Sequence, residues 1–197
     1  MKLTIDDIAD QRAYERERDE FRAHIIDLKK IRRIGIGPFV TVVFENRDTI
    51  RFQIQEMARA EKIVTDDAIQ TELDVYNPLI PEQGALAATL FIELTSKDDL
   101  VTWLPKLVGI ERSVELRIGE AGQEEVVRAR PDAAHERQLT RETITASVHY
   151  VHFELTAAQI ERFASEAVCV AVAHANYAYA TELGETSRQS LLDDLRG

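Results

Sequence analysis

Apolar residues follow a helical period in the first part of the chain. Tyr14, Phe21, Ile25 and Leu28 recur at this spacing among charged residues, which predicts a long surface helix from about Arg12 to Arg33. Such a helix buries one stripe, either against its own chain or against a second subunit. Thr4 precedes two aspartates and predicts the start of a short helix before it.

The segment 39–64 alternates between apolar and polar positions twice. A strand would place Val40, Val42 and Phe44 on one side, and a second strand would do the same with Ile50, Phe52 and Ile54. This pattern predicts a hairpin with one buried face, followed by a helix over 55–64. Two glycines and a proline at 35–38 separate the hairpin from the first helix.

The remaining chain predicts alternating helices and strands without an internal repeat. We expect helices at 65–76, 96–104, 157–166 and from 186 onward, strands at 85–95, 113–118, 124–130, 143–155 and 167–181, and a polar loop at 131–142. The fold class is therefore α+β, with a mainly antiparallel sheet, helices packed on one face and a long N-terminal helix. We expect a single domain over 1–197, with a helical arm at 1–34 and an α+β body at 35–197.

Composition excludes several classes of partner. The 35 acidic and 24 basic residues give a net charge of −11, which repels phosphate backbones, so we expect no nucleic-acid partner. The single cysteine, Cys169, excludes an intramolecular disulfide, and its apolar neighbours should raise its pKa. No apolar run approaches the ~20 residues that span a bilayer. We expect a cytoplasmic protein without a membrane partner.

Histidine and carboxylate residues near the C-terminus are candidates for a metal site. His152 and Glu154 share a side of the predicted strand, and His174 lies on the next one, so together they could hold zinc or iron if the strands pair suitably. His149 faces the opposite side. The alternative is that these residues are structural. Glu20 and His24, one helical turn apart, are best explained as a surface ion pair.

A polar set runs through the predicted second strand into the helix after it. Gln53, Gln55, Glu56 and Arg59 could bind a small polar ligand or a partner, or could simply border apolar faces. Serine nucleophile motifs, a phosphate-binding loop and Cys-x-x-Cys pairs are missing from the sequence. Whether the protein is an enzyme is therefore left open.

Three blocks of the sequence resemble a known bacterial family. They are FENRDTIRFQIQEMARAEKI, then ELDVYNPLIP with LAATLFIEL, and finally HYVHFELTAAQIERF with VAHANYAYATEL. Together they cover most of the chain and are similar to the domain-of-unknown-function family 3501. The resemblance implies an accessory role in redox or oxidative-stress metabolism, because family members tend to be encoded near rubrerythrin-like and iron-sulfur oxidoreductase proteins.

These observations favour a non-catalytic accessory protein of redox, oxidative-stress or iron metabolism. It would act through a rubrerythrin-like or iron-sulfur oxidoreductase partner, and the long helix could form a homodimer contact. One alternative is a metal-binding protein or metal-dependent enzyme that uses His152, Glu154 and His174. Another is a small-ligand sensor whose site lies beside residues 53–59.

Overall fold

The computed structural model describes residues 1–133 and 143–197. The helices are α1 (Gln11–Arg32), α2 (Arg47–Glu61), α3 (Asp66–Tyr76), α4 (Lys97–Trp103), α6 (Ala157–Ser165) and α7 (Glu185–Arg196), with 3₁₀ turns at Ile5–Asp7, Asn77–Leu79 and Ile110–Arg112. The strands are β1 (Arg33–Ile36), β2 (Val40–Glu45), β3 (Ala85–Ile92), β4 (Val114–Ile118), β5 (Glu125–Arg128), β6 (Arg130–Pro131), β7 (Val148–Glu154), β8 (Val168–His174) and β9 (Tyr177–Glu182).

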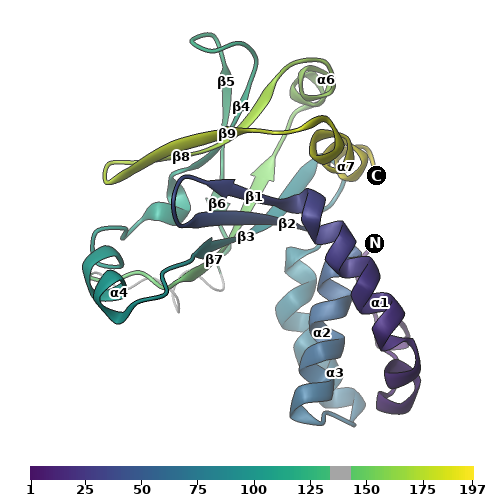
Figure 1. Ribbon diagram of the computed structural model, residues 1–197. Helices are drawn as coiled ribbons and strands as arrows, with labels where there is room; N and C mark the ends of the chain where they lie inside the picture. The colour runs from purple at the N-terminus through teal and green to yellow at the C-terminus, as the bar shows by residue number, and fades with distance from the viewer. Residues whose placement is uncertain (134–142) are drawn as a thin grey trace.

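The strands form two antiparallel sheets that pack face to face. The first sheet has the order β1-β2-β3-β7-β6 and the second has the order β5-β4-β8-β9 (Figure 1). Alternate residues from both sheets fill the space between them, including Val42, Leu90, Leu116 and Val170. The α+β class, the antiparallel pairing and the long N-terminal helix are confirmed, and the strands are shared between two sheets.

The hairpin expected within 39–64 is wrong in its second strand. The chain leaves β2 at Asn46, whose side chain accepts a hydrogen bond from the Thr49 backbone at 3.0 Å while the Thr49 hydroxyl accepts from the Asn46 backbone at 2.9 Å. This capping box starts α2 at Arg47. Ile50 and Ile54 are one helical turn apart and fully buried, so their spacing suits a helix as well as a strand. The partner of β2 in the hairpin is β1, which precedes it.

The strand expected at 167–181 is two strands joined by a tight turn. β8 ends at His174 and β9 begins at Tyr177, and these two residues are paired. Asn176 stabilises the turn, because its backbone N–H donates to His174 Nδ1 at 3.2 Å and its side chain donates to the Lys106 carbonyl at 2.8 Å. The strand expected from 143 is also shorter, since β7 begins at Val148.

Helices α1, α2 and α3 run side by side and extend away from the sheets, as Figure 1 shows. They form the arm of the molecule, together with residues 1–10, which we call the strap. The arm has an apolar cluster of its own, which includes Leu3, Ile50, Ile54, Ile69 and Leu73. The arm thus contains more of the chain than 1–34, and the assignment of 1–197 to one domain stays a prediction.

Several helix signals are confirmed. Ser96 and Thr156 accept backbone hydrogen bonds at the starts of α4 and α6, and α3 begins directly after Thr65. Leu191 and Leu195 of α7 are fully buried in the main core. Most of the polar loop expected at 131–142 lies outside the described residues. Within the described chain, no helix has the length and apolar character needed to cross a membrane.

Candidate functional site

Glu56 on α2 connects the first two helices of the arm. Its carboxylate accepts hydrogen bonds from the Tyr14 hydroxyl at 2.8 Å and from Arg18 Nε and Nη2 at 2.7 and 2.9 Å. These bonds, the Arg18 bond above all, lower the pKa of Glu56 to about 2, although partial burial opposes the shift. Burial and the bond to Glu56 raise the pKa of Tyr14. Glu56 is therefore an ionised group that joins α1 to α2.

Gln55 connects α2 to the strap. The Gln55 side chain is only 1% exposed, and its Oε1 accepts from the Ala9 backbone N–H at 2.7 Å. Its Nε2 donates to the Ala9 carbonyl at 3.2 Å. Further along the strap, Asn77 makes two hydrogen bonds with the Leu3 backbone at 2.8 and 2.9 Å. The strap is thus held against the helices of the arm by side chains that hydrogen-bond to its backbone.

A cavity of about 170 Å³ lies under the strap, between α1, α2 and α3. Most of its walls are apolar, and a few polar and charged side chains complete the lining. Its lining consists of Ile5, Ile8, Ala9, Asp10, Gln11, Tyr14, Gln55, Ala58, Arg59, Ile63, Val64, Asp66 and Ile69. The cavity is partly open to solvent, and Val64 in its lining is 78% exposed. An apolar cleft with a few polar groups is the usual form of a small-molecule site.

Arg59 contributes the positive charge of this cavity. Its guanidinium lies 3.4 Å from Glu56 and 3.9 Å from Glu15, both longer than the bonds that Arg18 makes to Glu56. Arg18 and Tyr14 therefore supply the short contacts to the Glu56 carboxylate, and Arg59 is its weaker partner. The Arg59 side chain is about one third exposed, at 35%.

Gln53 faces a second polar cluster, on the outer face of the first sheet. Burial, Tyr76 and Glu45 raise the pKa of the Tyr150 phenol, and the Gln53 side chain opposes that shift. Glu45 is 4% exposed and accepts from the Thr89 hydroxyl at 2.6 Å. Its other carboxylate oxygen has no hydrogen-bond partner among the described residues. This cluster places a buried carboxylate close to a partly buried phenol.

The structure does not bring His152, Glu154 and His174 together. His152 Nε2 lies 3.2 Å from the Asp132 carboxylate, and Glu154 lies 3.2 Å from Arg130. His174, at the end of β8 in the second sheet, lies 3.2 Å from the Val108 carbonyl. No three histidine, cysteine, aspartate or glutamate side chains within 1–133 and 143–197 gather closely enough to hold a metal ion. The described geometry gives these residues separate partners.

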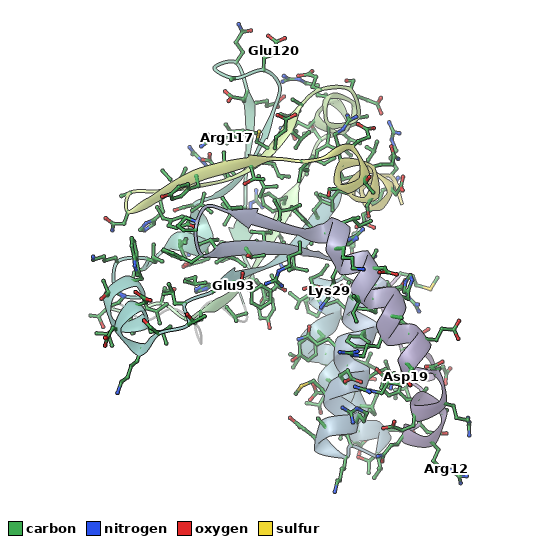
Figure 2. The ribbon with its side chains drawn as sticks, in the orientation of Figure 1. Arg12, Asp19, Lys29, Glu93, Arg117 and Glu120 are labelled. Carbon is green, nitrogen blue, oxygen red and sulfur yellow. The ribbon has the colours of Figure 1, made fainter. Side chains whose placement is uncertain are left out.

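Two other residues singled out from the sequence have clear surroundings. His24 lies 3.3 Å from Asp48 of α2 on the surface of the arm, a pairing different from the one expected with Glu20. Cys169 is partly buried on the outer face of the second sheet, where burial raises its thiol pKa, as expected. Figure 2 shows that Arg12 and Asp19 of α1 lie far from Arg117 and Glu120 of the second sheet.

Sequence reasoning missed the residues of the strap and of the α2–α3 connection that close the cavity. Ile5 and Ile8 lie near the short helix that Thr4 predicts, Ile63 lies in the helix predicted over 55–64, and the sequence marks none of the three as part of a site. The signal in the sequence is the apolar set Leu3, Ile5 and Ile8 in a short N-terminal segment, which other parts of the chain must cover. Which helices cover it depends on tertiary packing.

These features define an α+β protein in which a helical arm with its own small cavity projects from two packed sheets. The model of the family described as "Protein of unknown function (DUF3501)" matches residues 2–195, so the chain belongs to the DUF3501 family, as the resemblance indicated. It is similar to a novel protein of unknown function from Burkholderia pseudomallei, known from a crystal structure at 1.90 Å resolution. The two are 37% identical, with 99% of this chain and 100% of that chain covered and a TM-score of 0.89. A comparison with curated proteins gave no significant match.

Proposed function

We propose that the protein is a non-catalytic binding protein that holds a small ligand in the cavity of the arm. The observation that carries this proposal is the apolar cavity of about 170 Å³ beside Gln55 and Arg59. These are two of the four residues that the sequence marks as candidates for a ligand or partner site. Of the other two, Glu56 joins α1 to α2 behind the cavity wall and Gln53 faces the first sheet.

The chemistry of the lining supports binding without turnover. Among the described residues, the cavity lining contains no serine, cysteine, histidine or lysine. Two of its neutral polar side chains have structural partners, since Gln55 binds the Ala9 backbone and the Tyr14 hydroxyl donates to Glu56. A lining of this kind can select a ligand by shape and by one charge, and it offers no nucleophile paired with a base.

The position of the strap suggests how binding could be passed on to a partner. Ile5, Ile8 and Ala9 of the strap form one wall of the cavity, so a ligand there contacts the strap directly. A ligand stabilises the conformation to which it binds best, which here is the strap closed on α2. The proposed protein therefore reports the presence of its ligand through the order of its N-terminal segment.

The accessory role in redox, oxidative-stress or iron metabolism is a further proposal, and its support is the family resemblance. The same holds for a rubrerythrin-like or iron-sulfur oxidoreductase partner and for a cytoplasmic location. A homodimer is proposed on the basis of the long charged helix. Capture with a tagged chain tests the partner, and sedimentation analysis tests the dimer.

A panel of small metabolites, screened by thermal unfolding, tests the ligand site. The wild type is compared with Ala58→Leu, which puts a larger side chain into the cavity from a helical position where leucine is well tolerated. The proposal is supported if one or more compounds raise the melting temperature of the wild type and leave the melting temperature of Ala58→Leu unchanged. A panel in which every stabilising compound acts equally on both proteins contradicts the proposal, as does a panel without a stabilising compound.

A further inference from the structure

We infer that the ligand of the arm cavity is a monocarboxylate of about six to eight carbon atoms, most of which form its apolar body. This inference rests on the proposed function, and it adds the chemical class of the ligand. Arg59 would bind the carboxylate, and the isoleucine side chains of the cavity would surround the apolar body.

Arg59 is the group that selects an anion. Its own carboxylate contacts are long, at 3.4 Å to Glu56 and 3.9 Å to Glu15, because Arg18 already binds Glu56 through two nitrogens at 2.7 and 2.9 Å. A carboxylate in the cavity can accept two parallel hydrogen bonds from the planar guanidinium. If Arg59 binds the ligand in place of Glu56, the Glu56 carboxylate still has its hydrogen bonds from Arg18 and from the Tyr14 hydroxyl.

The acidic residues at the cavity limit the ligand to one negative charge. Asp10 and Asp66 line the cavity with Arg59, and Glu15 lies nearby. Asp10 accepts a hydrogen bond from the Ala13 backbone at 2.9 Å as the N-cap of α1, which lowers its pKa and keeps it ionised. A doubly charged phosphate would face these carboxylates with only one arginine to compensate, so a singly charged carboxylate is favoured.

The apolar walls set the size and character of the body. An apolar cavity of about 150 Å³ accommodates a benzene molecule, so 170 Å³ accommodates a body of similar or slightly larger size. Ile5, Ile8, Ile63 and Ile69 provide hydrocarbon contacts on several sides. A sugar or an amino acid would leave its hydroxyl or ammonium groups unpaired against these walls, which costs binding energy.

Amide NMR titrations with three matched probes test the ligand class. Hexanoate, hexanol and hexylamine share one chain length and differ in the head group. We expect hexanoate to shift the amide signals of Ala9, Ile63 and Val64 saturably, and to bind at least about tenfold more tightly than hexanol or hexylamine. Arg59→Gln should lower the affinity for hexanoate by about tenfold or more, while the affinity for hexanol should change little.

Two control variants keep this test decisive. Arg22→Gln removes an exposed arginine of α1 outside the cavity and should leave hexanoate binding unchanged. Arg59→Lys keeps the charge and should keep more affinity than Arg59→Gln, even if the side-chain geometry changes.

The failure of this inference can be told apart from failure of the proposed function. If hexanol or hexylamine binds in the cavity as tightly as hexanoate, or if Arg59→Gln binds hexanoate as the wild type does, the carboxylate class is overturned and the ligand site stands. If none of the three probes shifts the cavity amides, the class is overturned as well, and the metabolite panel with Ala58→Leu decides the proposed function.

Discussion

The side chain of Gln55 pairs with the backbone of Ala9 through two hydrogen bonds, 46 residues apart in the sequence. Its carbonyl oxygen accepts from the Ala9 N–H at 2.7 Å and its amide donates to the Ala9 carbonyl at 3.2 Å. The pairing mimics the contact between two neighbouring strands, with a side chain in place of one of them. It closes the strap over the cavity of the arm.

Gln55→Ala should release the strap. Because the Ala9 backbone then loses both partners at a partly buried position, we expect the free energy of unfolding to fall by about 2 kcal/mol. Urea denaturation measures this change, and faster hydrogen exchange at the Ala9 amide should accompany it. The matched control is Gln70→Ala, which removes an exposed glutamine paired with Asp74 and should change stability by less than about 0.5 kcal/mol. Equal effects of the two substitutions would show that the strap is not held by Gln55.

Glu56 predicts an acid-dependent loss of stability. Its pKa is lowered from the ordinary 4.5 to about 2, so the folded state binds its proton less readily than the unfolded state does. Its contribution is therefore fully present above pH 4.5 and is lost as the pH falls towards 2. We expect this loss to be on the order of 2 kcal/mol, and to be absent from Glu56→Gln.

Urea denaturation from neutral pH down to about 2.5 measures this dependence. The control is Glu61→Gln, an exposed carboxylate on the same helix, which should keep the pH profile of the wild type. A Glu56→Gln variant that loses stability with acid as steeply as the wild type would contradict the assignment of this carboxylate as the link between α1 and α2.

A buried ion pair anchors the arm to the C-terminal helix. Arg32 at the end of α1 is 2% exposed, and its Nη2 lies 2.6 Å from Asp194 of α7. Asp194→Ala leaves this guanidinium buried without its carboxylate, and should lower the free energy of unfolding by about 3 kcal/mol. The double variant Arg32→Met, Asp194→Leu removes both charges and should recover most of the loss.

Chemical denaturation of the single and double variants measures both effects. The control is Asp193→Ala, which removes a neighbouring exposed carboxylate. Its free energy of unfolding should change by less than about 0.5 kcal/mol. A double variant no more stable than Asp194→Ala would mean that side-chain packing at this junction, rather than the unpaired charge, dominates.

The sequence predicts the local elements well wherever a cap or an apolar stripe marks them. The long helix at 11–32, the starts of α3, α4 and α6 and the buried leucines of α7 follow from such signals. The errors occur where a pattern suits two structures. The apolar positions 50, 52 and 54 alternate as in a strand, yet Ile50 and Ile54 also lie one helical turn apart. The capping box at Asn46 starts a helix here, so the helical spacing is the one the structure uses.

Tertiary relationships were much harder to predict. Nothing local indicates that β7 and β8 belong to different sheets, or that the chain turns at Ala175 and Asn176 rather than continuing as one strand. The same limit applies to the candidate site. The sequence marks Gln55 and Arg59 as a polar pair on α2, but the opposite wall comes from the strap, and long-range packing brings the two together. Whether they bind a ligand stays a prediction.

The central claim is that the arm cavity between the strap and α2 is a ligand site. A crystal structure of the protein, grown with the panel compound that raises its melting temperature most, tests this claim most directly. The account predicts electron density for the compound among Ile8, Ala58 and Ile69, with a polar atom within hydrogen-bond distance of Arg59. Density for the compound at another place on the protein, with the arm cavity empty, would contradict it.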